Sequence, residues 1–186
     1  MKFALREEPW EHWDITDVIP TDKFSKVQKR VASWDKTPPD KRRISKFIVG
    51  DKERDGYIYD PWLYEILKER FAMLLNGIDY KYYTTIFEYN SCPAGYSYPI
   101  HVDAPEKIAS LVIYISENGD GTSLYNDKHE LIRKTEWKPN NGFLFYRYDD
   151  THHSYESTVN HRDTINCILV KKDKDLLRNL RYEGHV

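Results

Sequence analysis

Three residues of metal-binding types lie in a pattern that could do oxidative chemistry. His101 and Asp103 are separated by one residue, and His153 follows Asp103 after fifty residues. Two imidazoles and one carboxylate can hold three neighbouring positions of an octahedral metal ion and leave the other three open, an arrangement that suits iron(II). Arg162 then supplies a cation where a dicarboxylate co-substrate would need one. The pattern predicts a metal, its ligands and a class of reaction.

The residues around His101 predict an extended backbone over 98–103. This segment contains aromatic and β-branched residues, with a proline two positions before the histidine. Alternate residues of a strand share a face. We therefore expect His101 and Asp103 to point to the same side, with Val102 pointing away.

The distal residues are expected to come from other strands that lie alongside. His153 directly precedes a strand-like run over 154–159. Arg162 opens the next strand-like run, in which Thr164 and Asn166 share its face. The fold must bring the run that follows His153 next to the strand of His101, because the metal needs all three ligands.

In order and in sequence, these motifs resemble those of the iron(II)/2-oxoglutarate-dependent dioxygenases, and within them the prolyl 4-hydroxylase-like group. Residues 95–103, Gly-Tyr-Ser-Tyr-Pro-Ile-His-Val-Asp, are similar to that group's GxxYxxHxD. Further segments resemble its next strand, its GGxT turn, its distal-histidine element and its arginine-x-Ser/Thr, namely 107–115, 119–122, 151–154 and 162–164. The resemblance covers about residues 80–170, and the first 79 residues carry no recognisable motif.

This resemblance implies a mainly β fold with flanking α-helices, the double-stranded β-helix, which is a cupin-like jelly roll of two facing sheets. It implies that His101, Asp103 and His153 bind Fe(II). The neighbouring His152 is an alternative distal ligand. The similarity of the Thr-x-His-Ser element and its offset to Arg162 favour His153.

The resemblance also implies a binding site for 2-oxoglutarate. Arg162 would clamp the distal carboxylate with both arms of its planar guanidinium, and the hydroxyls of Tyr98 and Thr164 would bond to the same carboxylate. The 2-oxo acid end would chelate the iron and leave one position for O2, and the products would be succinate, CO2 and a hydroxylated substrate. Two positions depart from the group's pattern: Cys92 stands where tyrosine is common, and Asp120 replaces the second glycine of the turn.

The sequence leaves the primary substrate open among a protein side chain of prolyl type, an amino acid and another small metabolite. Arg147, Asn166 and Tyr96 are candidates for the substrate cleft. A cupin-like metalloenzyme that does not use 2-oxoglutarate would explain the triad, but it gives Arg162 and Thr164 no task. A non-catalytic jelly-roll binding module could retain the motif by descent, although the intact triad and arginine argue against it.

Length predicts a single domain over 1–186. Within it, the resemblance implies a helical, buttressing region over 1–79, a catalytic core over 80–170 and a tail over 171–186. The 28 basic and 30 acidic residues give a net charge of −2, which argues against nucleic acid as a partner. No apolar run approaches the roughly 18 residues of a membrane helix, and the acidic residues near the start are unlike a signal peptide. We therefore expect a cytoplasmic protein, whose oligomeric state the sequence does not predict.

The secondary structure of the remaining segments follows from periodicity and capping signals. A helix is expected over 22–34 with its cap at Thr21 or Asp22, and a second helix is expected to begin at Asp60-Pro61. A short helix is expected around Leu176–Leu180. Further strands are expected over 44–49, 81–89 and 143–148, whereas 118–141 reads mostly as turns with one strand near 131–137.

Overall fold

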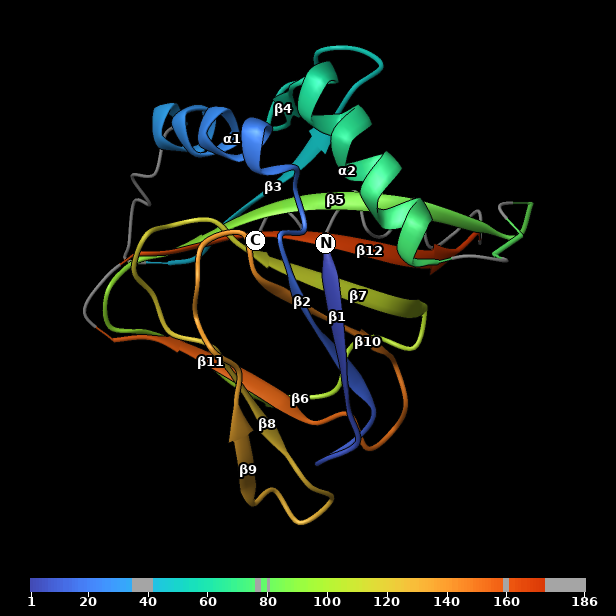
Figure 1. Ribbon diagram of the computed structural model, residues 1–186, viewed down its shortest axis with the longest axis vertical. Helices are drawn as coiled ribbons and strands as arrows, with labels where there is room; N and C mark the ends of the chain where they lie inside the picture. The colour runs from blue at the N-terminus through green and yellow to red at the C-terminus, as the bar shows by residue number, and fades with distance from the viewer. Residues whose placement is uncertain (35–41, 76–77, 80, 159–160, 173–186) are drawn as a thin grey trace.

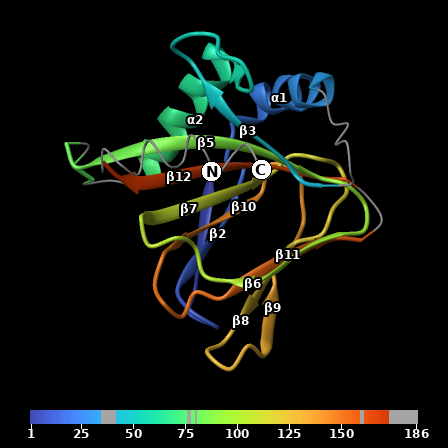
Figure 2. The same ribbon diagram turned by 180° about the vertical axis from the view of Figure 1, so that it is seen from behind.

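The computed structural model describes residues 1–34, 42–75, 78–79, 81–158 and 161–172. Two sheets face one another, and two helices cover the outer face of the larger sheet (Figure 1 and, from behind, Figure 2). The smaller sheet closes the opposite side, so that the sheets enclose an interior between them. This is the expected jelly-roll architecture.

The larger sheet has eight strands in the order β1-β2-β10-β7-β12-β5-β3-β4, and the smaller sheet has four in the order β6-β11-β8-β9. The strands of the larger sheet are β1 (Lys2–Arg6), β2 (His12–Thr16), β10 (Gly142–Tyr146), β7 (Lys107–Tyr114), β12 (Arg162–Lys171), β5 (Tyr83–Cys92), β3 (Ile44–Val49) and β4 (Ile58–Tyr59). Those of the smaller sheet are β6 (Tyr96–His101), β11 (His153–Ser157), β8 (Thr122–Tyr125) and β9 (Leu131–Lys134). The helices are α1 (Thr21–Ser33) and α2 (Pro61–Leu74). Neither helix is long and apolar enough to cross a membrane.

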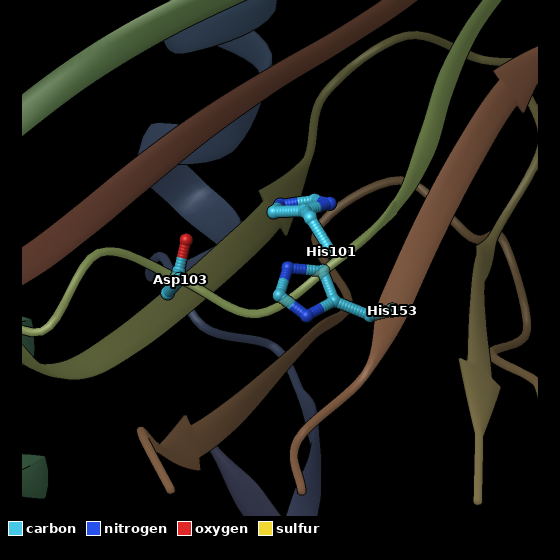
Figure 3. Close-up of side chains that lie close together, drawn as sticks. All are labelled: His101, Asp103 and His153. Atoms are coloured by element: carbon cyan, nitrogen blue, oxygen red, sulfur yellow. The ribbon is translucent and has the colours of Figure 1, made fainter. Parts of the chain in front are cut away.

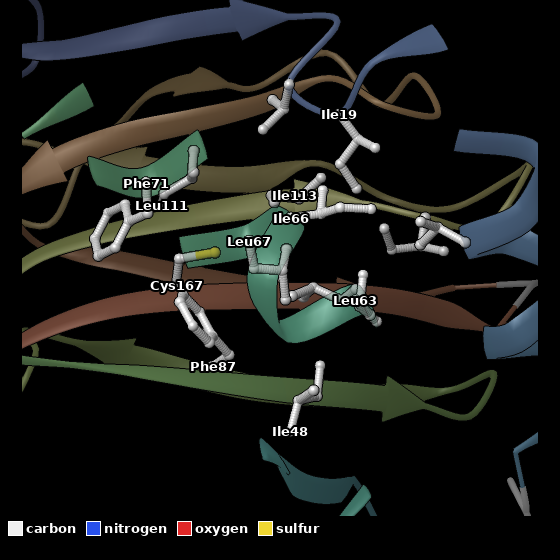
Figure 4. Packing of buried hydrophobic residues seen from close by; sticks show 14 of the residues in the cluster. Ile19, Ile48, Leu63, Ile66, Leu67, Phe71, Phe87, Leu111, Ile113 and Cys167 are labelled. Carbon is white, nitrogen blue, oxygen red and sulfur yellow. The ribbon is translucent and has the colours of Figure 1, made fainter. Parts of the chain in front are cut away.

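The alternation of side chains in β12 divides the interior of the protein into two parts. Ile165, Cys167 and Leu169 point to the helices and join the main hydrophobic cluster, which is packed between α2 and the larger sheet (Figure 4). Thr164 and Asn166 point the other way, into a cavity between the sheets. One strand therefore supplies both the core that stabilises the sheet and part of the wall of the cavity.

The second helix begins as its sequence predicts. Asp60 is the N-cap, and its Oδ1 accepts a hydrogen bond of 3.0 Å from the backbone N–H of Leu63. Pro61 occupies the first turn, where it costs no hydrogen bond. The other carboxylate oxygen of Asp60 accepts a 2.5 Å ion-pair bond from Arg30 of α1. This one buried carboxylate thus joins the two helices.

Removing this cap should destabilise the protein measurably. Asp60→Ala is expected to lower the free energy of unfolding by about 2 kcal/mol, since it removes the cap and leaves Arg30 without its partner. Asp60→Asn retains a capping oxygen and should lose clearly less. Urea denaturation of the three proteins measures the difference, and equal losses in both variants would contradict the capping role.

The N-terminal region holds more strand than the sequence indicates. Residues 1–79 carry the two expected helices and also β1 to β4, all four in the larger sheet. The cap predicted at Thr21 or Asp22 for the first helix is wrong: Pro20 is the N-cap, and it provides no side-chain hydrogen bond. β8 lies in a segment expected to be turns. The expected tail from residue 173 onward, with its short helix, lies outside the described residues.

A buried histidine ties β2 to the smaller sheet. His12 is fully buried; its Nδ1–H donates to the carbonyl of Trp10 at 2.8 Å, and Arg133 of β9 donates to its Nε2 at 2.9 Å. Nε2 can accept only while the imidazole is neutral. Burial lowers the pKa of His12 below its ordinary value of 6.5.

The stability of the protein should consequently fall in mild acid. Above pH 6.5 the imidazole is neutral in both states; below it, the unfolded protein binds a proton that folded His12 takes up only at a lower pH. The free energy of unfolding should decrease as the pH falls from 6.5 toward the folded pKa, by at most about 1.4 kcal/mol per pH unit. Denaturation of the wild type and of His12→Gln at a series of pH values isolates this contribution. Identical slopes in the two proteins would contradict it.

Candidate metal and co-substrate site

The three residues expected to bind metal lie together. One potential ligand atom from each of His101, Asp103 and His153 lies within 4.8 Å of the others (Figure 3). The register of the smaller sheet explains the pairing of the histidines, because His153 of β11 lies opposite His101 of β6. The sequence predicted extended structure through Asp103, but strand β6 ends at His101, so that Asp103 belongs to the segment that follows the strand.

The tautomers of both histidines leave a lone pair available for a metal. The Nδ1 atom of His101 lies 3.0 Å from the carbonyl oxygen of Pro99, and that of His153 lies 2.9 Å from the carbonyl of Thr151. A carbonyl only accepts, so each Nδ1 carries the hydrogen and each Nε2 is free to bind a cation. Burial lowers the pKa of His101, and it lowers that of His153 to about 4. Both rings are therefore neutral near pH 7, as metal ligation requires.

Two cavity residues hold the carboxylate of Asp103. Lys107 donates to its Oδ1 at 2.7 Å, and the Ser110 hydroxyl donates to its Oδ2 at 2.8 Å. Burial by itself raises the pKa of this carboxyl, but the positive charge of Lys107 and these hydrogen bonds outweigh it and keep the pKa below its usual value. Asp103 is thus a buried anion fixed in position. Ser110 is a site residue that the sequence did not reveal, since its signal was only its polarity inside an apolar strand.

The structure separates His153 from its neighbour His152. The ring of His152 packs against His129 at a centroid distance of 4.5 Å. It is not among the three residues whose ligand atoms converge, nor does it line the cavity. The geometry therefore places His153 at the candidate metal site.

One cavity of about 740 Å³ connects this site with the expected co-substrate residues. Its walls include His101, Asp103 and His153 and also Tyr98, Arg162 and Thr164. The interior between the sheets thus contains all six of the residues to which the sequence assigns metal or co-substrate binding.

Arg162 is a buried cation aimed at this cavity. Only 2% of the residue is exposed. Its Nε donates to the carbonyl of Asp120 and its Nη2 to the hydroxyl of Thr122, both at 3.0 Å, and its guanidinium lies 4.4 Å from the ring centroid of Tyr155. No carboxylate of the described residues forms an ion pair with it. A buried charge without a counter-ion is costly, and an anionic ligand would remove that cost.

The hydroxyl residues near Arg162 are only partly engaged. The Thr164 Oγ1 atom is buried and has no hydrogen-bond partner among the described residues. The ring of Tyr98 stacks on Tyr155 with an interplanar angle of 5° and contacts the ring of His101 edge-on. An oxygen-rich ligand beside Arg162 would supply the partner that Thr164 lacks.

The three residues expected in the substrate cleft have different positions. Tyr96 and Asn166 line the cavity. Arg147 does not: its Nε donates to the backbone carbonyl of Asp103 at 3.2 Å, and its Nη1 pairs with Asp149 at 2.6 Å. The segment after β10 thus turns Arg147 toward the backbone that carries Asp103, and its role in substrate binding stays a prediction.

The comparisons with known proteins concern the fold. No protein-family model and no curated protein matches the sequence. Among solved structures it is similar to a prolyl-4-hydroxylase from Pseudomonas putida, with a TM-score of 0.62 and 12% sequence identity over 87% of this protein and 93% of that one. It is also similar to the viral collagen prolyl hydroxylase vCPH from Paramecium bursaria Chlorella virus-1 in its 2OG complex, with a TM-score of 0.61 and 13% identity over 85% and 94%.

A third similar structure is an oxidoreductase of the 2OG-Fe(II) oxygenase family from Burkholderia pseudomallei, with a TM-score of 0.61 and 13% identity over 86% of this protein and 84% of that one. At sequence identities this low, the structural similarity shows only that the strands are arranged alike, and it says nothing about the substrate. The expected double-stranded β-helix is confirmed, and the resemblance to the prolyl 4-hydroxylase-like group holds at the level of the fold, which this protein shares with those enzymes.

Proposed function

We propose that this protein is an Fe(II)- and 2-oxoglutarate-dependent dioxygenase that hydroxylates a C–H bond of its substrate. One observation carries the proposal: a single cavity contains the converging donor atoms of His101, Asp103 and His153 together with buried Arg162, which has no acidic partner among the described residues. A cation-binding group and an anion-binding group in one enclosed space match a metal with a dicarboxylate co-substrate.

The residues present fit both groups. The two Nε2 atoms and the Asp103 carboxylate would hold the iron and occupy three of its six positions. Arg162 would bind the distal carboxylate of 2-oxoglutarate through the guanidinium edge that its bonds to Asp120 and Thr122 leave available. Thr164 and Tyr98 would add hydroxyl groups to that carboxylate.

When bound, iron and 2-oxoglutarate with O2 supply the oxidising chemistry and release succinate and CO2. The protein positions and shields these groups. Carbonyls of Pro99 and Thr151 orient the two imidazoles, and Ser110 fixes one oxygen of Asp103. The Phe145 ring packs edge-on against His153 with a distance of 5.1 Å between the ring centroids, so that an apolar group covers this side of the imidazole.

Lys107 has a further task in this scheme. In the structure its ammonium bonds to the Asp103 oxygen Oδ1. A divalent ion that binds this oxygen would compete with the ammonium, so we expect Lys107 to move away from it when metal binds. In the metal-free protein, the ammonium of Lys107 keeps the buried carboxylate of Asp103 ionised.

Arg162 also distinguishes the proposal from the other two readings. A cupin-like metalloenzyme without 2-oxoglutarate would need the triad but not a buried, unpaired arginine beside it. A binding module would need neither the triad nor the arginine.

The two free thiols, Cys92 and Cys167, are buried, which supports a place in the reducing cytoplasm. The primary substrate belongs to the classes of peptide side chain, amino acid or small metabolite.

The proposal is tested by following succinate. The protein reconstituted with Fe(II) and supplied with 2-oxoglutarate and O2 should form succinate, and omission of any one of the three should stop the reaction. Asp103→Asn should reduce the rate by more than about 100-fold, because it removes the anionic ligand. The absence of succinate from the wild type would contradict the proposal, and a rate unchanged in Asp103→Asn would remove this residue from the site.

A further inference from the structure

The cavity contains a second pair of opposite charges, in addition to the residues already assigned to metal and co-substrate. Arg43, just before β3, and Glu88 of β5 both line it. No nitrogen of Arg43 comes within the 4.0 Å ion-pair distance of a Glu88 oxygen, and neither residue forms an ion pair with any other described residue. Burial of the guanidinium by itself lowers the pKa of Arg43, but Tyr155 and, after it, Glu88 raise the pKa above its ordinary value. A gap separates two opposite charges on one wall.

Neighbouring side chains fix the carboxylate of Glu88. The hydroxyl of Ser45 donates to its Oε1, and the amide of Asn90 donates to its Oε2 at 3.0 Å. Asn90 Oδ1 and Asn166 Oδ1, on cavity-lining residues, are buried without hydrogen-bond partners among the described residues. This wall is thus rich in acceptors, and a ligand with several N–H donors would complement it.

Aromatic groups position Arg43 in a similar way. Its Nη1 donates to the hydroxyl of Tyr155 at 3.0 Å, and its guanidinium lies 5.3 Å from the ring centroid of Tyr98. These contacts occupy one nitrogen and one face of the guanidinium. The remaining N–H groups are suited to an anion.

The strand register shows how this pair lies relative to the triad. Ile86, two residues before Glu88, lies on the same face of β5 and opposite Ile168 of β12. Ile168 in turn lies opposite Ser110 of β7, whose hydroxyl holds Asp103. Ile86 is therefore two strand spacings, about 10 Å, from Ser110. An apolar path leads from the charged pair toward the candidate metal.

We propose that Arg43 and Glu88 bind the two charged groups of a free α-amino acid, its carboxylate on Arg43 and its ammonium on Glu88. Its side chain, apolar to match Ile86 and Ile168, extends over them toward the triad. This proposal rests on the proposed function and names its substrate class. In the reaction a C–H bond of that apolar group becomes C–OH with one atom of O2, while the other atom enters succinate as 2-oxoglutarate is oxidised and loses CO2.

Both charges must come from one small molecule for this fit. A residue inside a peptide has neither an ammonium nor a carboxylate on its α-carbon and would leave Arg43 and Glu88 without partners. A dicarboxylate would match the positive charge of Arg43, but its second carboxylate would be repelled by that of Glu88. An α-amino acid carries both opposite charges in one small molecule, one for each of the two side chains.

The test uses valine, leucine, isoleucine and methionine, each as the free L-amino acid, the N-acetyl derivative and the carboxamide. Binding is measured by calorimetry on the full-length protein loaded with Mn(II) and 2-oxoglutarate, so that no turnover occurs. At least one free amino acid should bind saturably. Blocking either charged group should weaken its binding by about 10-fold or more, since each block removes a charge-assisted hydrogen bond.

Two variants assign each charge to its residue. Glu88→Gln should weaken binding of the free amino acid and abolish its advantage over the N-acetyl form, whereas Arg43→Gln should abolish its advantage over the carboxamide. Glu69→Gln, on the exposed side of α2, is the matched control and should leave all affinities unchanged. Thermal unfolding verifies that each variant is folded.

The outcomes separate this proposal from the proposed function. Equal binding of free and blocked forms, or binding of apolar peptides without binding of any free amino acid, would overturn the role of the charged pair. If no amino acid binds while the protein still forms succinate from 2-oxoglutarate, the substrate class is wrong and the proposed function stands. Variant-sensitive amino-acid binding without any succinate would support the charged pair and contradict the proposed function.

Discussion

Replacing His153 with alanine is expected to abolish iron(II) binding near neutral pH, and with it the turnover of 2-oxoglutarate. Only three ligand atoms converge in the described part of the protein, so the variant keeps two. Loss of a contact that merely supports a metal ligand costs about 10- to 100-fold in affinity, and loss of the ligand itself should exceed that range. Equilibrium dialysis against Fe(II) under anaerobic conditions measures the effect.

The adjacent histidine supplies the matched control for this experiment. His152→Ala removes an imidazole that packs against His129, outside the cavity. It should leave the iron affinity and the rate of succinate formation within about twofold of the wild type, because its side chain is outside the cavity and substitutions away from a site have small effects. Loss of iron in His152→Ala with retention in His153→Ala would reverse the assignment of the distal ligand.

The second large effect is expected at Arg162. Arg162→Lys retains the positive charge but loses the planar fork, and with it part of the bidentate contact to a carboxylate. We expect the dissociation constant for 2-oxoglutarate to rise by about 10- to 100-fold, the equivalent of one charge-assisted hydrogen bond. The affinity for iron should change little. Calorimetric titration of the Mn(II)-loaded variant with 2-oxoglutarate measures the dissociation constant for 2-oxoglutarate.

The control for this variant is a partly buried arginine elsewhere in the protein. Arg133 of β9 is paired with Asp14 and lies outside the cavity that contains Arg162. Arg133→Lys should lower stability somewhat and leave 2-oxoglutarate binding unchanged. An unchanged dissociation constant in Arg162→Lys would remove Arg162 from its assigned role.

Much of the site could be predicted from the sequence, because the alternation of side chains along single strands determines which residues face it. His153 and Arg162 each begin a strand whose pattern is visible in the sequence. The face shared by Arg162, Thr164 and Asn166 follows from a period of two and needs no knowledge of the partner strands. His101 and Asp103 meet His153 although Asp103 lies past the end of its strand, since the two residues that follow the strand are enough to bring the carboxylate to the histidines.

Features that depend on which strands lie side by side could not be predicted from the sequence. Strand β1 is exposed along its whole length, so that Phe3 and Leu5 carry no signal of burial. Strand β8 has only four residues, and its partners come from distant segments. The approach of Arg43 to Glu88 likewise requires β3 to lie beside β5. Capping preferences could not place the start of α1, because its N-cap is Pro20, which offers no capping side chain and stands one residue before the expected cap.

The central claim, that one cavity binds iron(II) and 2-oxoglutarate together, is tested most directly by anaerobic titration of the Fe(II)-loaded protein with 2-oxoglutarate. Chelation of the iron by the 2-oxo acid should produce a weak visible charge-transfer band that saturates with the co-substrate. The same band should need much more 2-oxoglutarate in Arg162→Lys. Iron that binds without ever producing the band would contradict the claim and favour a metalloenzyme that does not use 2-oxoglutarate.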